Sequence, residues 1–314
     1  MDGFVSVIFA VLPPLLLLFI GAMARKMKWL RAEADTSLSM ITLRILYPSF
    51  IIHHILNSNV SLDSTTVILP LYGFLSIVLG FCLAWVVSMI FGLSGKELQT
   101  FRFCSGIFNY GFIAIPVAMA LFESEIVVHI ILFNLGVEIA IWTIGIFVLT
   151  NGKLKFKGFI NPPIVSVFIA LIIQETIGFS MIPVFIWEVV KSLGNCAIPI
   201  GLILIGGSFY QLFKGFNFSQ KCKVEVASVM VRNIIFPVIV LSFLLVDLLP
   251  NEIDWLREIL VVQSAMPAGI FAVVVVGNYE GDKMTALRSI PITMIVGILS
   301  IPFWLFWGLK ILSL

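Results

Sequence analysis

Two ionisable side chains lie inside long apolar segments of the chain, where charge is costly. Arg44 is about nine residues into the apolar segment 36–56, and Glu138 is about twelve residues into the segment 126–149. A charge at the bilayer centre costs at least about 2.5–3.5 kcal/mol, so such residues usually pair or act on a ligand. We therefore expect Arg44 and Glu138 either to form a buried ion pair or to exchange that pairing for a substrate. Arg44 would then hold a carboxylate through two hydrogen bonds, and Glu138 would be a candidate for proton coupling.

Polar and helix-breaking residues occur together in two further apolar segments. The first reads Cys104-Ser-Gly-Ile-Phe-Asn109-Tyr110-Gly111-Phe-Ile-Ala-Ile-Pro116, and the second reads Gln263-Ser264-Ala-Met-Pro267-Ala-Gly269. Proline removes a backbone donor and glycine tolerates non-helical conformations, so both segments are predicted to break. Backbone groups freed in lipid must be satisfied by protein or by a wet cavity. The simpler alternative is a pair of proline kinks in ordinary packing helices.

These residues predict a binding site. Half-helix N-termini at such breaks present partial positive charge, which favours an anion. Tyr110 could stack on the substrate or simply pack. The predicted substrate-binding residues are Asn109, Tyr110, Gly111, Pro116, Gln263, Ser264, Pro267, Gly269 and Arg44.

The other reactive side chains do not form a recognisable catalytic or metal site. The adjacent His53 and His54 point about 100° apart on a helix, which disfavours joint metal ligation. Glu188 and Lys191, three residues apart, suit an intrahelical pair. The four cysteines form no CxxC pair and are predicted to pack as small residues: Cys82, Cys104, Cys196 and Cys222. No HExxH, GxSxG or Walker A motif occurs, so we expect no enzyme, no metal and no cofactor.

The composition requires a membrane. Of the 314 residues, 60% are hydrophobic and only 11% are charged, and the mean hydropathy is +1.13. A soluble domain carries about 25% charged residues, so soluble enzymes, secreted disulfide scaffolds and disordered proteins are largely excluded. The net charge of +2 gives no reason to expect nucleic acid as a partner. The chain is predicted to be an all-α polytopic membrane protein whose main partner is the lipid bilayer.

Ten spans of about 20 apolar residues can be placed. They are 4–24, 36–56, 65–91, 103–121, 126–149, 160–177, 184–210, 224–248, 256–278 and 286–309. The odd-numbered loops, counted with Arg232, hold 15 of the 19 Lys and Arg residues. By the positive-inside rule these loops face the cytoplasm, so both termini are predicted to lie on the outer side of the cytoplasmic membrane. The apolar segment at 4–24 has its cations after it rather than before it, which favours a retained first helix over a cleaved signal.

Proline spacing indicates an internal repeat. Three pairs of prolines lie 149 to 151 positions apart: Pro14 and Pro163, Pro48 and Pro199, and Pro116 and Pro267. The predicted halves are 1–150 and 151–314, each with five spans. Because five is odd, the second half must cross the membrane inverted. Inverted repeats with matching broken helices are typical of secondary transporters.

Several motifs together resemble the bacterial branch of the auxin efflux carrier family. They are Asn109-Tyr-Gly-Phe-Ile-Ala-Ile-Pro116, Phe133-Asn134-Leu-Gly136, Trp142-Thr-Ile-Gly145, Asn161-Pro162-Pro163 and Met266-Pro267-Ala-Gly269. The resemblance covers essentially the whole chain. It implies a scaffold domain (spans 1, 2, 6 and 7), a transport domain (spans 3–5 and 8–10) crossing at broken spans 4 and 9, and a possible homodimer through the scaffold. It also implies an elevator-like carrier of small organic anions, either malate- or malonate-like carboxylates or auxin-like acids.

Other functions stay open at this stage. A sodium-coupled bile-acid-type symporter would use the same fold, but the two breaks offer no acid for a sodium site, so protons are the favoured coupling ion. A membrane sensor could use the same pocket without transport. A membrane-embedded enzyme acting on lipid would need a polar catalytic cluster, and none is visible in the sequence.

Overall fold

The computed structural model describes residues 2–58, 64–152, 161–176, 178, 182–214, 222–246 and 254–313. The predicted loop cations Lys153, Lys155 and Lys157 therefore lie outside the described residues. Within them the chain is helical, and the one β-bridge is an isolated pair of residues.

The helices follow the apolar segments closely. Those that precede the first break are α1 (Asp2–Lys26), η1 (Ala32–Ala34), α2 (Asp35–Ile41), η2 (Thr42–Leu46), α3 (Tyr47–Leu56), α4 (Ser64–Val67), α5 (Leu69–Ile90) and α6 (Gly95–Gly106). The chain continues through α7 (Ala114–Leu121), α8 (Ile126–Ala140), η3 (Ile141–Gly145), α9 (Ile146–Leu149), α10 (Pro162–Thr176) and α11 (Val184–Lys214). It ends with α12 (Lys223–Val229), η5 (Met230–Ile235), α13 (Phe236–Leu245), α14 (Asp254–Ala265), α15 (Phe271–Asn278) and α16 (Lys283–Leu312).

Seven of the described helices are long and apolar enough to cross a membrane. They are Gly3–Lys26, Ala32–Leu56, Leu69–Ile90, Ile126–Leu149, Val184–Gln211, Lys223–Leu245 and Lys283–Leu312. The shorter α10 is also apolar, and the two interrupted pairs α6/α7 and α14/α15 occupy the predicted fourth and ninth spans. The all-α membrane class is therefore confirmed, while the count of ten crossings stays a prediction.

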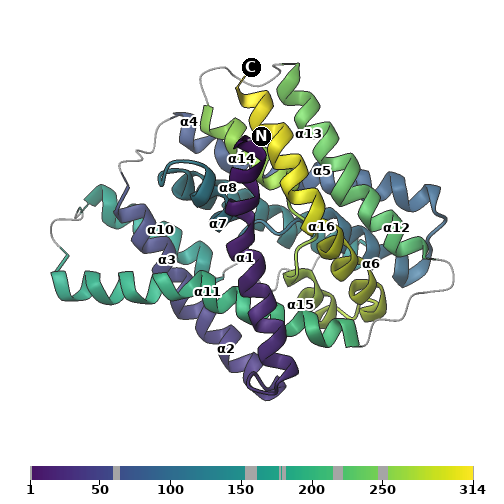
Figure 1. The fold of residues 1–314 in the computed structure, drawn as a ribbon, viewed down its shortest axis with the longest axis horizontal. Helices are drawn as coiled ribbons and strands as arrows, with labels where there is room; N and C mark the ends of the chain where they lie inside the picture. The colour runs from purple at the N-terminus through teal and green to yellow at the C-terminus, as the bar shows by residue number, and fades with distance from the viewer. Residues whose placement is uncertain are drawn as a thin grey trace.

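The helices pack as two groups, and one of these groups contains the interrupted pairs. On one side α1 and α3 pack against α11, and α3 also packs against α10. On the other side α5 packs against α6 and α8, and α16 packs against α6, α12 and α14. Figure 1 shows α2, α3, α10 and α11 together on one side, α5, α6, α12 and α13 on the other, and α1 between them. The division into a scaffold domain and a transport domain stays a prediction.

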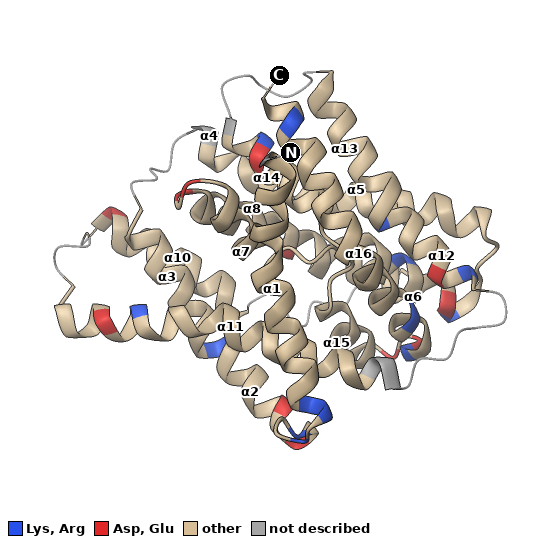
Figure 2. Cartoon of the chain, in the orientation of Figure 1, with Lys and Arg blue, Asp and Glu red and all other residues tan. Residues whose placement is uncertain are grey.

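Among the described residues, most charged side chains gather at a few places on this apolar body. Figure 2 shows Lys and Arg gathered at the turn between α1 and α2 and around α6 and α12, with most of the helical surface uncharged. Arg25 near the end of α1 is buried and pairs with Asp35 at the start of α2, which fixes this turn. Arg288 binds Glu225 through two hydrogen bonds of 2.8 Å and thereby joins α16 to α12. These pairs lie at helix ends, where charge is tolerated.

Two glycines bring α5 and α8 into backbone contact. A Cβ atom on Gly136 would collide with the Pro70 carbonyl, and one on Gly73 would collide with the Phe133 carbonyl. Helix interfaces in membranes commonly use small residues in this way, because association there depends on close packing rather than on hydrophobicity. Gly136 thus fixes α8, which carries Glu138, against α5.

Gly136→Ala is therefore expected to destabilise the fold. The added methyl meets backbone rather than a movable side chain, and overpacking of this kind lowers the thermal midpoint by roughly 5 °C or more. The midpoint of the purified protein measures the effect. Gly3→Ala is the matched control, since a Cβ there meets nothing nearer than 4.0 Å. A Gly136→Ala protein as stable as this control would contradict the α5–α8 contact.

The proline spacing does not align the two breaks. The last residues of α6 and α14, Gly106 and Ala265, are 159 positions apart, and the first residues of α7 and α15, Ala114 and Phe271, are 157 apart. Pro267 lies between helices, whereas Pro116 is the third residue of α7. The offset of 151 between these two prolines is therefore not the offset between the breaks. The inverted arrangement of the halves 1–150 and 151–314 stays a prediction.

Candidate functional site

The two breaks cross at the centre of the molecule and satisfy each other's backbone. Phe108 and Ala268 form an antiparallel bridge. The Asn109 amide donates to the Pro267 carbonyl at 2.9 Å, and the Gly269 amide donates to the Ile107 carbonyl at 2.9 Å. Such pairing is needed because unsatisfied backbone groups cost several kcal/mol away from water. The predicted breaks around Asn109 and Pro267 are thus present and in contact.

A cavity of about 310 Å³ opens on one side of this crossing. The crossing contributes Phe108 to Phe112 and Gly269 to Phe271, and α8 and η3 contribute Glu138 and Trp142. The opposite wall comes from the other helix group: Ser39, Thr42, Leu43 and Tyr47 from α2 to α3, Asn161 to Pro163 at α10, and Gly201, Leu204, Ile205 and Ser208 from α11. The cavity therefore lies between the two helix groups.

The half-helices α7 and α15 both begin at this cavity. Gly111 and Phe112 precede α7, Ile270 precedes α15, and all three line the cavity. No side chain caps either helix start. The Ile115, Ala272 and Val273 amides donate to the backbone carbonyls of Gly111, Gly269 and Ile270. Two partially positive helix ends thus meet the cavity, an arrangement that suits an anion.

Glu138 is held by hydrogen bonds from three other side chains. Its Oε1 accepts from the Tyr110 hydroxyl at 2.6 Å, and its Oε2 accepts from Trp142 Nε1 at 2.8 Å and Asn161 Nδ2 at 3.0 Å. Asn161 stands just before α10, and its Oδ1 accepts from the Ile164 amide. Glu138 therefore links the crossing and η3 to the opposite helix group, through a neutral amide.

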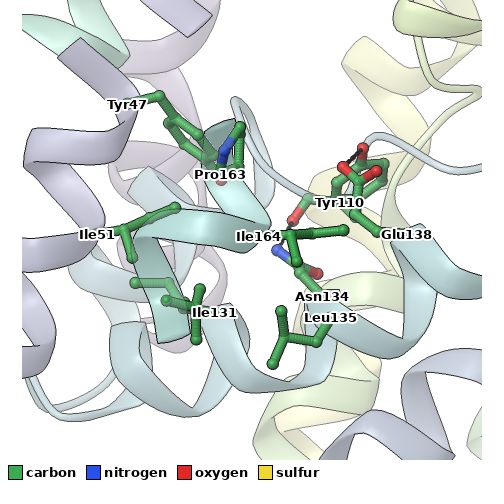
Figure 3. Close-up of a pocket in the computed structure, with 10 residues that line it drawn as sticks. Tyr47, Ile51, Tyr110, Ile131, Asn134, Leu135, Glu138, Pro163 and Ile164 are labelled. Carbon is green, nitrogen blue, oxygen red and sulfur yellow. Dashed lines mark hydrogen bonds between the residues drawn. The ribbon is translucent and has the colours of Figure 1, made fainter. Parts of the chain in front are cut away.

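A small second cavity adjoins this network. It measures about 20 Å³ and shares Tyr47, Tyr110, Glu138 and Pro163 with the larger one. Figure 3 shows Tyr110 and Glu138 pointing toward one another, with Asn134 reaching the Tyr110 backbone. A space of this size holds about one water molecule.

Arg44 does not belong to this site. Its side chain is exposed, and it is absent from the lining of both cavities. The described partners of Glu138 are Tyr110, Trp142 and Asn161. The prediction that Arg44 pairs with Glu138 is therefore wrong. Arg44 lies at a suitable depth along its span, but its position around the helix axis directs the side chain away from the site.

Arg44→Gln is expected to leave transport within about twofold of wild type, since exposed charges outside a site contribute little. Uptake into reconstituted vesicles measures this. A loss of transport of tenfold or more would show that Arg44 takes part in substrate transport.

Four other predicted residues lie beside the cavity rather than on it. Gln263 is buried and donates to the Tyr110 carbonyl at 3.2 Å and to Asn134 Oδ1 at 3.5 Å. Ser264 is buried and bonds within its own helix to Val261. Pro116 lies in α7, and Pro267 supplies the carbonyl that Asn109 binds. These residues support the crossing, while Asn109, Tyr110, Gly111 and Gly269 line the cavity. That they bind substrate stays a prediction.

Sequence reasoning missed several lining residues and one charge. Tyr47, Trp142 and Asn161 complete the site; Trp142 follows Glu138 by four residues, a spacing that places both on one helix face. Arg232, counted above as a loop cation, is fully buried in the π-helical turn η5 behind the crossing. Its position inside the apolar segment 224–248 was the signal that could have found it.

No cluster of three or more His, Cys, Asp or Glu side chains suits a metal among the described residues. All four cysteines are free thiols. The site can therefore bind through helix ends, amides, hydroxyls and aromatic faces, with one carboxylate available for a proton.

A multi-pass membrane protein with a cavity between two helix groups at crossed, broken helices has the architecture of a membrane transporter. The family model described as membrane transport protein matches residues 6–155 and 146–305. The chain belongs to this family, the auxin efflux carriers.

Two curated relatives agree with this assignment. An uncharacterized transporter of Methanocaldococcus jannaschii is 28% identical over 305 residues, which cover 94% of this chain and 96% of the relative. An uncharacterized transporter of Methanothermobacter thermautotrophicus is 20% identical over 299 residues, with the same coverage of 94% and 96%. The family and these relatives are transporters and not enzymes.

Proposed function

We propose that the protein is a secondary carrier of small organic anions, driven by protons or by the substrate gradient, in the cytoplasmic membrane. The observation that carries this proposal is the cavity of about 310 Å³ at which two half-helices begin, both without a side-chain cap. Asn109, next to these helix starts, would donate its side-chain amide to the carboxylate. We further propose that the loops rich in Lys and Arg face the cytoplasm, that both termini lie outside, and that the protein forms a homodimer through its scaffold.

The lining of the cavity narrows the substrate class. No Lys or Arg lines it among the described residues, so anion recognition would depend on helix ends and neutral donors. Aromatic rings form much of the wall: Tyr47 lies 5.6 Å from Phe112, and Trp142 lies 6.0 Å from Phe271, between ring centres. This favours an acid with one carboxylate and an apolar body, the auxin-like kind, over malate or malonate.

Glu138 is the proposed proton carrier. Trp142 and Asn161 can only donate to Oε2, whereas the Tyr110 hydroxyl at Oε1 can rotate and accept instead. The network therefore stabilises the ionised carboxylate and leaves Oε1 as the place for a proton. The adjoining water-sized cavity would connect this atom to a proton path.

The proposed mechanism is an elevator. The cavity wall is shared between the crossing with α8 and the group formed by α2, α3, α10 and α11, so a substrate in the cavity would contact both. Movement of the crossing relative to the other group would carry the substrate across. The Glu138–Asn161 hydrogen bond spans this boundary and would have to break or follow the motion.

Uptake of labelled indole-3-acetate, malate and malonate into proteoliposomes tests the proposal, with proton and sodium gradients imposed separately. The expected result is flux of indole-3-acetate that rises with a proton gradient and is unchanged by sodium. Sodium-dependent flux would favour a bile-acid-type symporter. Binding without flux of any of the three would favour a sensor.

A further inference from the structure

Arg232 is a buried cation with no acidic partner in the part of the chain that the structure describes. Its side chain has no exposed surface, and Nη2 donates to the Met266 carbonyl at 3.2 Å. Its Nε and Nη1 atoms have no hydrogen-bond partner among the described residues. The guanidinium instead lies over two rings, 4.1 Å from the centre of Phe236 and 5.3 Å from that of Phe108. An intramembrane arginine in this state is expected to have a function.

The negative charge that faces Arg232 comes from helix ends. Met266 directly follows the last residue of α14, and Phe108 follows the last residue of α6 by two positions. Each helix C-terminus carries about −0.5 of an elementary charge, so the two half-helix ends together offset about one cation. Faces of aromatic rings add further attraction for a guanidinium. Arg232 therefore lies beside the residues that follow the C-terminal ends of both half-helices.

The crossing is polarised as a consequence. The positive starts of α7 and α15 meet the cavity, and Arg232 contacts the Met266 carbonyl after α14 and the Phe108 ring after α6. In transporters with broken helices, such C-terminal ends and unwound carbonyls are where coupling cations are coordinated. Here the place is filled by a side chain of the chain itself.

We propose that the Arg232 guanidinium is the resident cation of the helix crossing, standing where a sodium ion would otherwise be needed. Arg232 is thus a positioning residue: it neutralises the half-helix ends, holds the crossing through Met266 and Phe108, and makes the carrier independent of sodium at this site. The consequence for transport rests on the proposed function; the consequence for stability does not.

The first test needs no substrate. Thermal midpoints of the purified wild-type, Arg232→Lys, Arg232→Gln and Arg44→Gln proteins are compared in NaCl, KCl and choline chloride at equal ionic strength. We expect the same wild-type midpoint in all three salts and a fall of roughly 5–10 °C for Arg232→Gln. Arg232→Lys, which keeps the charge, should recover more than half of that fall, and Arg44→Gln should match wild type.

The second test is flux. Arg232→Gln should lose at least about tenfold of the carboxylate uptake, Arg232→Lys should retain a clear part of it, and wild-type uptake should be equal in sodium and choline. Specific stabilisation or stimulation of the wild-type protein by sodium would overturn the proposal. So would an Arg232→Gln protein as stable and active as Arg44→Gln.

The two tests separate the two proposals. If Arg232→Gln does not fold, the salt comparison on the wild-type and Arg232→Lys proteins decides. If wild type carries none of the three carboxylates, the proposed function fails, and the thermal comparison still decides on Arg232.

Discussion

Glu138→Gln is expected to reduce proton-driven accumulation of substrate at least about tenfold. Exchange of substrate across the membrane should stay within about threefold of wild type. Glutamine has the shape of a protonated glutamate. Its oxygen can keep the bonds from Trp142 and Asn161, and its amide can donate to a rotated Tyr110 hydroxyl. The variant would therefore be fixed in the protonated form, able to bind and move but unable to take up or release a proton.

Counterflow and gradient-driven uptake, measured side by side in proteoliposomes, separate these two activities. Glu188→Gln on the exposed side of α11 is the matched control and should change neither. Glu138→Ala should lose both, because it leaves the donors of Tyr110, Trp142 and Asn161 without an acceptor. Undiminished accumulation by Glu138→Gln would refute a proton-carrying Glu138.

Asn109→Ala is expected to reduce transport about 10- to 100-fold with the fold intact, because a hydrogen bond to a charged group contributes roughly 1.5–3 kcal/mol. The Asn109 backbone amide, which binds the Pro267 carbonyl, is unchanged by the substitution. The loss should appear mainly as weaker binding of the carboxylate, measured as the concentration that gives half-maximal uptake.

Asn57→Ala, at the exposed end of α3, is the matched control for this substitution. An Asn109→Ala protein whose thermal midpoint also falls by several degrees would indicate a structural contribution instead of binding. Uptake by Asn109→Ala equal to that of wild type would show that Asn109 does not bind the substrate.

The sequence predicted the fold well because apolar length is a local property. Most described helices have bounds near the predicted spans, although α6 begins at Gly95, eight residues before the predicted fourth span. The breaks at Asn109 and Pro267 followed from residues that cannot stay helical in lipid without help. The antiparallel pairing of Phe108 with Ala268 joins residues 160 positions apart. Nothing local to either residue specifies that pairing.

The direction of polar side chains was harder to predict than their depth. Arg44 and Arg232 are both arginines within apolar segments, yet one is exposed and the other has no exposed surface. Their positions within the apolar segments predict a similar free-energy cost of burying charge in the membrane for both. Only tertiary packing shows which of the two faces the crossing. For Glu138, the predicted ion pair with Arg44 is absent, and its partner from the opposite helix group is the neutral amide of Asn161.

The proline offset misled for a similar reason. Proline marks places where a helix tolerates a missing donor, and these include the first turn of α7 as well as the break before α15. Pro116 and Pro267 therefore share a residue type without sharing a structural position.

Substrate protection of a single cysteine tests most directly whether the cavity is the transport site. Ser208 lines the cavity from α11, opposite the crossing. Ser208→Cys would be introduced into a protein whose four native cysteines, Cys82, Cys104, Cys196 and Cys222, are replaced. It would be labelled by a small thiol reagent in proteoliposomes with and without the carboxylate that the uptake panel identifies. Our account predicts that the carboxylate slows labelling severalfold, with half-maximal protection near the concentration for half-maximal uptake. Labelling unchanged by a carboxylate that the protein transports would contradict it.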